Sequence, residues 1–441
     1  MSRGMHLGKI AKASVSSPIQ ACFDGKYVWV TNSGATKVFE VWANSTADLG
    51  IDPERKVTEV GSVSGHNNCS FLSYGNGFMW IAKKSAVSGR STMLFDTIIK
   101  VNTLTYEVVE TIRTPISQPH KEEPTSVYSH MTHEYIMMNS VLHFAQGKLW
   151  MVEDYVDALS NGGIQRVWVY DTALGSWTSQ TFSAKIQKNR AQITSANGFV
   201  YISAYNSLAV LKYNADSTAF VSSIRGNANP NALTAQPDGK ILVTSYNGLI
   251  SHLKTDDSWT HDLQVDTDEC TAIAFESAAQ CWVVDGSGNL FRVGSDNYVY
   301  GSGYKDGQGQ DTDYTLLVAN NMLDETVLNG DGDQVMWNKD LLAVQGDMVD
   351  VNYNTLNKYS FSDSIDFVIT IPSLTYEKWN GTQMVDVTQP VLVVVLTDSE
   401  VVVINTSEIK FGFPRPSISR STMSAVGVGM ITYGQNDYLG D

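Results

Sequence analysis

The residues with the clearest potential for chemistry form a histidine-rich stretch, in which His130 and His133 are followed directly by Glu134. If this stretch is helical, the two histidines share a face, and imidazole and carboxylate groups are ligands that Zn²⁺ prefers. A His-Glu-x-x-His motif is missing, however, and a polar loop between structural units explains the same residues. We therefore predict a polar loop here, with a metal site at His130, His133 and Glu134 as the alternative.

A second polar stretch is similar to the start of a calcium-binding loop. Asn329, Asp331 and Asp333 alternate with glycines, as the first oxygen ligands of such a loop do. The glutamate that completes such a ligand set is missing, and Asn, Asp and Gly are also the residues that turns favour. The sequence predicts plain turns and no cofactor, with a structural calcium ion as the alternative.

The remaining sequence offers no further chemistry. It contains no nucleophile elbow, phosphate-binding loop or dinucleotide fingerprint. Four tryptophans instead recur at one position of a repeated phrase, and recurrence of this kind indicates packing between sheets rather than a carbohydrate platform. We predict no catalytic residues and a protein that is not an enzyme. The four tryptophans are Trp29, Trp80, Trp150 and Trp282.

Composition narrows the class of protein. The chain has 441 residues, 43% of them hydrophobic, and a formal net charge of −16. This acidic balance argues against nucleic acid as a partner, because phosphate binding needs clustered Lys and Arg. No stretch approaches the ~20 apolar residues of a membrane helix, and the N-terminal residues lack the apolar segment of a signal peptide. The four cysteines have no metal-binding spacing, so we expect buried free thiols made in a reducing compartment.

A sequence phrase that repeats along the chain determines the strands between which all of these residues lie. A turn containing Gly, Asp or Asn is followed each time by a short apolar strand, usually with an aromatic residue. Three further strand-like segments accompany each copy, so every unit is predicted to be a four-stranded up-and-down sheet. One such sheet cannot bury both faces, whereas several stacked in a ring can. The copies begin at Asp24, Gly75, Gln146, Asn197, Asp238 and Ala279.

The sequence therefore predicts an all-β fold, a single β-propeller of seven or eight four-stranded blades within residues 1–413. A strand within residues 5–15 is expected to complete the last blade and close the ring, which removes an open edge. Residues 115–135 are predicted to form a long loop between blades. Residues 414–441, with two prolines at their start, are predicted to form an extended C-terminal arm.

The number of blades depends on residues 300–389, where the repeat is irregular. Leu341–Val344 and Met348–Tyr353 resemble a pair of inner strands, which gives eight blades. If this region is partly an insertion, the count falls to seven.

Residues 18–34, which read PIQACFDGKYVWVTNSG, resemble a YVTN-type propeller blade, and the resemblance extends from Leu7 to about Val293. It implies the fold but not one function, since that family includes adhesive surface layers, lyases and scaffolds. A lyase-like metal site needs a histidine on an inner loop with a partner one blade away. His143 and His252 are instead expected on strands.

The acidic, cysteine-poor composition, the long loop and the extended tail are also similar to propeller proteins of bacteriophage tails. This resemblance implies a virion component, assembled in the host cytoplasm, that binds neighbouring virion proteins through its propeller faces and C-terminal arm. It also implies a homo-oligomer within an assembly. The acidic composition and the lack of a long apolar stretch predict no nucleic acid binding and no membrane insertion. The alternatives are an exported cell-surface binding propeller and a propeller enzyme such as a metal-dependent lyase.

Overall fold

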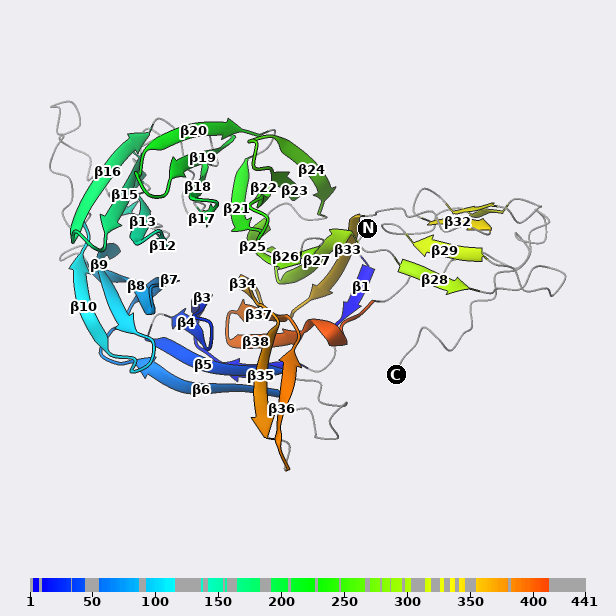
Figure 1. The fold of residues 1–441 in the computed structure, drawn as a ribbon, viewed down its shortest axis with the longest axis horizontal. Helices are drawn as coiled ribbons and strands as arrows, with labels where there is room; N and C mark the ends of the chain where they lie inside the picture. Colours follow the sequence, from blue (N-terminus) through cyan, green and yellow to red (C-terminus); the bar gives the residue numbers. More distant parts are fainter. Residues whose placement is uncertain are drawn as a thin grey trace.

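Seven four-stranded sheets surround a common axis in the structure, a computed structural model (Figure 1). Each sheet is one blade, and its strands alternate in direction from the inner strand to the outer one. The structure describes residues 3–7, 10–32, 34–43, 55–86, 93–115, 136–137, 142–153, 155–156, 165–182, 192–204, 208–226, 229–245, 247–265, 270–277, 280–285, 287–295, 298–302, 314–318, 326–328, 334–337, 341–345, 354–379 and 382–411.

Blades 1 to 5 are consecutive stretches of chain in which each strand pairs antiparallel with the next. The inner strand comes first and the outer strand last. These blades consist of β3 (Pro18–Phe23), β4 (Val28–Asn32), β5 (Thr36–Ala43) and β6 (Arg55–Val63); β7 (Cys69–Gly75), β8 (Phe78–Ala86), β9 (Met93–Asn102) and β10 (Val108–Arg113); β12 (Leu142–Ala145), β13 (Lys148–Glu153), β15 (Gln165–Asp171) and β16 (Ser176–Phe182); β17 (Ile193–Ala196), β18 (Phe199–Ala204), β19 (Ala209–Asn214) and β20 (Phe220–Arg225); and β21 (Pro230–Ala235), β22 (Ile241–Ser245), β23 (Leu249–Leu253) and β24 (Trp259–Gln264).

Blades 6 and 7 are interrupted by insertions. A separate five-stranded sheet lies between the third and fourth strands of blade 6, and a two-stranded hairpin lies between the first and second strands of blade 7. The blades are β25 (Cys270–Ser277), β26 (Gln280–Asp285), β27 (Asn289–Ser295) and β33 (Asn354–Ser360), then β34 (Ile365–Ile371), β37 (Leu392–Thr397), β38 (Glu400–Asn405) and β2 (Ala11–Ser14). The insertion sheet contains β28 (Tyr298–Ser302), β29 (Tyr314–Val318), β30 (Thr326–Leu328), β31 (Gln334–Trp337) and β32 (Leu341–Gln345), and the hairpin contains β35 (Leu374–Trp379) and β36 (Met384–Gln389).

The blade count is therefore seven, and the alternative of eight is wrong. Leu341–Val344 does form a strand, within β32, but it pairs with β29 and β31 of the insertion sheet rather than with an inner partner. The ladder of blade 6 continues across the insertion, from Asn289 opposite Ser360 to Ser295 opposite Asn354. The second half of the predicted pair, Met348–Tyr353, lies mostly outside the described residues.

The N-terminal segment closes the ring, as the sequence predicts. β2 is the outer strand of blade 7 and pairs antiparallel with β38, from Ala11 opposite Val403 to Ser14 opposite Glu400. A second contact lies just before it, where β1 (Arg3–His6) pairs in parallel with β33 of blade 6 and antiparallel with β39 (Lys410–Phe411). The two ends of the described chain thus add two strands to the outer edge of blade 6 (Figure 1).

The period-2 alternation of the strands explains how the blades pack. On β8, Met79 and Ile81 enter an apolar cluster shared with blade 1, whereas Trp80 and Ala82 enter a cluster shared with blade 3. The same alternation recurs around the ring, and the described residues form one buried cluster at each of the seven junctions. Burial on both faces is what makes a closed ring of small sheets stable.

The recurring tryptophans lie inside these junctions, which confirms their predicted packing role. Each is at most 1% exposed. On β4, β8 and β13 the indole points into the junction with the next blade and meets an aromatic ring there, at centroid distances of 5.6 to 5.9 Å. The pairs are Trp29 with Tyr106, Trp80 with Phe144, and Trp150 with Tyr213.

Candidate interaction surfaces

The six residues considered for metal binding lie outside the described residues. Across the part of the chain that the structure describes, no three His, Cys, Asp or Glu side chains are grouped so that they could hold a metal ion. In the same part of the chain, no helix has the length and apolarity needed to span a membrane. The six residues are His130, His133, Glu134, Asn329, Asp331 and Asp333.

Two histidines lie on strands, as predicted. His252 is on β23 and His143 is on the inner strand β12. His143 faces blade 4, where its Nε2 lies 2.9 Å from Oγ of Ser195 on the inner strand β17. Burial lowers the pKa of His143 to about 4, so the imidazole is neutral near pH 7. A neutral, weakly basic imidazole in this place stabilises the junction.

All four cysteines are free thiols, and Cys69, Cys270 and Cys281 are buried, as predicted, whereas Cys22 is partly buried. Burial raises the pKa of Cys22 to about 12 and also raises the pKa of Cys69. Cys270 and Cys281 are fully or almost fully buried in the cluster between blades 5 and 6. Because the thiolate is the reactive form, the raised pKa values of Cys22 and Cys69 lower the reactivity of these two thiols.

Hydrogen bonds between inner strands tie neighbouring blades together near the axis. Gln20 Oε1 accepts a bond of 2.8 Å from the backbone N–H of Leu72, and Ser73 Oγ accepts one of 2.7 Å from that of Phe144. The Asn231 side chain donates to the carbonyl of Cys270, and Thr370 donates to that of Phe275. With the His143–Ser195 bond, these contacts bridge five junctions. They hold the blades in fixed register around the axis.

Because the strands of a blade alternate in direction, its connections lie at two ends. The turns joining strands one to two and three to four define what we call the turn face. The links joining strands two to three, and one blade to the next, define the connection face. Every insertion can therefore be placed on one face or the other from the strand order alone.

The turn face is extended at blades 6, 7 and 1. The insertion sheet leaves the end of β27, and the β35–β36 hairpin leaves the end of β34. Residues 44–54 join the third and fourth strands of blade 1. Both ends of the described chain belong to the same sector, since β1 precedes the outer strand of blade 7 and β39 follows its third strand. Figure 1 shows the hairpin and the insertion sheet reaching past the outer strands.

The connection face is extended at blades 2 to 4 instead. Its longest link, residues 114–141, joins blade 2 to blade 3. The loop predicted at 115–135 falls within this link and lies almost wholly outside the described residues. Within this link β11 (Ile136–Met137) pairs with β14 (Tyr155–Val156), which lies in the link between the second and third strands of blade 3. The elaborated sectors thus lie on opposite faces and on roughly opposite sides of the ring.

On the turn face, blades 2 to 4 carry no such insertion among the described residues. Each of them has instead the same rigid turn between its third and fourth strands. In each turn an Asn or Asp side chain accepts hydrogen bonds from the backbone N–H groups two and three residues further on. A contact with the neighbouring hairpin supports it, since Thr103 and Thr172 donate to the carbonyls of Gly77 and Gly147. Such side-chain bonds replace the backbone pairing that turns lack. The accepting residues are Asn102, Asp171 and Asn214.

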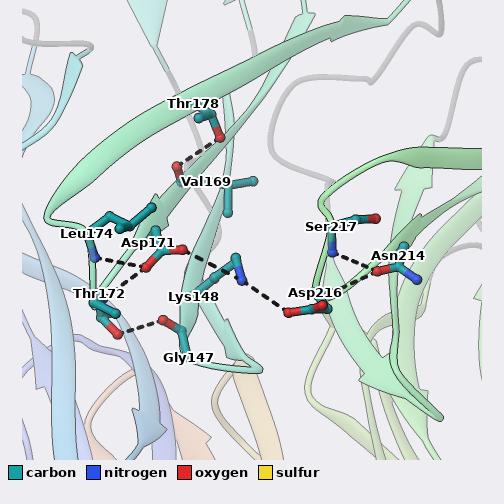
Figure 2. A network of polar contacts seen from close by, with 11 residues as sticks. Gly147, Lys148, Val169, Asp171, Thr172, Leu174, Thr178, Asn214, Asp216 and Ser217 are labelled. Atoms are coloured by element: carbon teal, nitrogen blue, oxygen red, sulfur yellow. Dashed lines mark hydrogen bonds and ion pairs between the residues drawn. The ribbon is translucent and has the colours of Figure 1, made fainter.

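Figure 2 shows how two of these turns are linked across blades 3 and 4. Nζ of Lys148 lies 3.7 Å from Oδ2 of Asp171 and 3.7 Å from Oδ1 of Asp216. The backbone N–H of Leu174 holds the pKa of Asp171 below its usual value, and Lys148 acts in the same direction. The Asp216 side chain is 94% exposed, so its part of the contact is weak.

The tips of two turns expose leucines. Leu104 is 82% exposed and Leu174 is 77% exposed, although both belong to turns fixed by hydrogen bonds. Single exposed apolar residues are common on protein surfaces. The hydrogen bonds of these turns hold the backbone of both leucines in place on the turn face.

Several features of these surfaces escaped the sequence analysis. The His143–Ser195 pair joins residues on different blades, and no local pattern reveals such a contact. The ion pair in which Arg292 donates to Glu276 at 2.8 and 3.0 Å joins two strands of blade 6. Only the polar turns at Asp171 and Asn214 had a visible signal, namely a turn residue after an apolar strand.

Comparisons with known proteins found a similarity among solved structures alone. No protein-family model matches this chain, and no curated protein matches it. Among 1085 matching solved chains is the β-propeller domain of Cps50 (Swd1) from Myceliophteria thermophila, with 8% identity and a TM-score of 0.48. That match covers 90% of this chain and 99% of the other. The chain is a β-propeller by its own strand order, and this similarity adds no functional argument.

Proposed function

We propose that this chain is a non-enzymatic structural scaffold of a bacteriophage virion, specifically a tail component that binds neighbouring virion proteins. The observation that carries the proposal is the grouping of added segments into two sectors on opposite faces of the ring. A subunit with two different surfaces on opposite sides suits heterologous, head-to-tail contacts. Copies of this chain and other tail proteins are the partners that such surfaces would bind.

The ring itself suits this role. Apolar clusters fill the junctions, and hydrogen bonds tie the inner strands together. Strands and turns of such a base keep their positions when a neighbour binds, which lowers the entropy lost in assembly. The resemblance to YVTN-type blades supports the propeller fold and leaves the function open. The resemblance to bacteriophage tail propellers supports the virion part of the proposal, with residues 414–441 acting as an arm on a neighbour.

Cryo-electron microscopy and mass spectrometry of purified native particles test this function. We expect the chain at a fixed copy number and at a symmetric position in the tail. Replacing the β35–β36 hairpin, residues 374–389, by a short glycine linker should lower incorporation while the ring still folds. A chain that remains in the soluble fraction and is lacking from particles would contradict the proposal.

A further inference from the structure

The outer strands of the blades differ in how they are protected. An outer strand has one row of backbone N–H and C=O groups without a partner, and natural proteins block such edges with charges, bulges or covering strands. In four blades, the described outer strand contains a bulge, where one residue has no cross-strand partner. The skipped residues are Val60, Val109, Val221 and Asp262, in β6, β10, β20 and β24.

The same four strands also carry charge. β6 contains Arg55, Lys56 and Glu59, and β10 contains Glu110 and Arg113. β20 ends at a charged residue, Arg225, and β24 contains the bulged aspartate. The remaining edges are blocked in other ways. β33 is covered by β1, and β2 is only four residues long and includes a lysine.

In the described part of blade 3, every one of these devices is missing. Its outer strand β16 reads SWTSQTF and has no charged residue. It pairs with β15 over seven consecutive positions without a bulge, from Gln165 opposite Phe182 to Asp171 opposite Ser176. Among the outer strands of the described residues, β16 alone combines a regular ladder, a neutral sequence and an uncovered edge.

This edge is also fixed in position. The Trp177 indole N–H donates to the carbonyl of Arg113 on blade 2 at 3.1 Å. On the other side, the Gln180 side-chain amide donates to the carbonyl of Thr218 on blade 4 at 2.6 Å. A strand anchored to both neighbours loses little further freedom when another strand pairs with it.

The hydrogen bonds of the neighbouring blades show which backbone N–H and C=O groups of β16 point away from β15. Just before the equivalent turns, Asn102 N–H donates to the carbonyl of Glu107 at 3.0 Å, and Asn214 N–H donates to that of Ala219 at 2.9 Å. The matching pair in blade 3 is Asp171 and Ser176, so alternate residues from Ser176 onward bond to β15. The N–H and C=O groups of Ser179 therefore point away from the blade.

The chain already extends one blade in this way. The terminal strands β1 and β39 lengthen blade 6 beyond its fourth strand. Thirty residues follow β39, and 421–436 contain no charged side chain. Within them Val426, Val428 and Met430 alternate with small residues, the pattern of a strand. In the sequence this segment follows β39, which lies at the edge of blade 6, and blade 6 is almost opposite blade 3 in a ring of seven.

We propose that the β16 edge of blade 3 accepts the C-terminal segment around residues 425–433 of a second copy of this chain as a fifth strand. Backbone hydrogen bonds to an exposed edge supply the affinity in this mode of recognition, and side chains on alternate positions supply specificity. Donor and acceptor sites on opposite sides of the ring make the contact head-to-tail. The inference rests on the proposed scaffold function and names the partner.

The test uses the full-length chain and two variants with complementary defects. S179K places a lysine on the free edge, a device that edge strands use against pairing. V428D places a charge in the donated segment. The matched control is S223K, which makes the same change at an exposed position of the bulged edge β20.

We expect wild type and S223K to form concentration-dependent oligomers by analytical ultracentrifugation, and S179K and V428D each to remain monomers. An equimolar mixture of S179K and V428D retains one intact edge and one intact segment, so it should form heterodimers and stop there. Unchanged thermal melts confirm that the variants fold. If S179K does not fold, V428D alone tests the contact.

A monomeric wild type, or wild-type oligomers in both variants, would overturn the inference. Monomeric variants whose mixture does not associate would also overturn it, because one intact edge and one intact segment would then be insufficient for association. These outcomes are separable from the proposed function. A chain that enters particles but does not self-associate retains the scaffold role with a different partner, whereas one that self-associates but is missing from particles loses the virion role alone.

Discussion

The phenyl ring of Phe144 on blade 3 stacks on the indole of Trp80 on blade 2, with centroids 5.9 Å apart and an interplanar angle of 13°. The stack depends on a glycine, because a Cβ on Gly75 would overlap the phenyl ring. Gly75 has no left-handed φ, so packing alone requires glycine there. Aromatic contacts of this kind set the spacing between blades.

We expect Gly75→Ala to lower the free energy of unfolding by about 1–3 kcal/mol, the usual range for overpacking a well-filled core. Denaturant unfolding followed by tryptophan fluorescence measures the loss. Gly34→Ala is the matched control, since its nearest neighbour is Asn32 Oδ1 at 3.4 Å. Equal stability of the two variants would show that the junction adapts to a methyl group.

The neutral histidine between blades 3 and 4 makes stability depend on pH. His143 has a folded-state pKa of about 4 and an unfolded-state pKa of ~6.5, so the unfolded chain takes up the proton first as pH falls. Stability from this group is complete above about pH 6.5 and decreases down to about pH 4. We expect the loss to be about 1–3 kcal/mol for this partly buried side chain.

Denaturant unfolding at several pH values measures this slope, and His143→Asn should flatten it. A smaller slope should remain, because burial and Lys83 also lower the pKa of His66. The same slope in wild type and His143→Asn would assign the pH dependence to other groups.

The sequence predicts the ring well because its repeat is local. A turn, an apolar strand and a buried tryptophan fall within a few residues. The motifs around Trp80 and Trp150 therefore identify two of the blades from the sequence alone. The blade count was harder, since Leu341–Val344 alternates like an inner strand and nothing local shows that it joins an inserted sheet. Contacts between blades, such as His143 with Ser195, and bulges such as Val109, depend on register, which no single strand encodes.

The buried ion pair of blade 6 should be far more important than an exposed pair. Arg292 donates two hydrogen bonds to Glu276, which also accepts one of 2.6 Å from the Trp282 indole. Their side chains are only 11% and 7% exposed. Glu276→Gln leaves a buried guanidinium without its counter-charge, so we expect a loss of about 3–5 kcal/mol.

Thermal and denaturant unfolding measure that loss, with Glu400→Gln as the control. Glu400 pairs with Lys12 at 2.7 Å, but the lysine side chain is 45% exposed, so we expect a change below about 1 kcal/mol. A Glu276→Gln protein as stable as the control would mean that another group neutralises the charge of Arg292.

The thiols offer a probe of the closed ring. A thiol-specific reagent should modify none of the four cysteines in the native protein and all four after denaturation, since burial raises the pKa of Cys22 and of Cys69. Rapid modification of one thiol without denaturant would show that its junction opens.

Two nested deletions separate ring closure from the extension of blade 6. Removing residues 1–6 deletes β1 but keeps β2 and Leu7, which is buried between blades 6 and 7. We expect a loss of about 1 kcal/mol, because a short added strand contributes little by itself. Removing residues 1–14 also deletes the outer strand of blade 7 and the Leu7 side chain, and we expect a loss of about 3–5 kcal/mol. Unfolding of the longer deletion should also become less cooperative, since blade 7 then ends at the open edge of β38. If both deletions cost the same, the decisive contact is the pairing of β1 with β39 rather than that of β2 with β38.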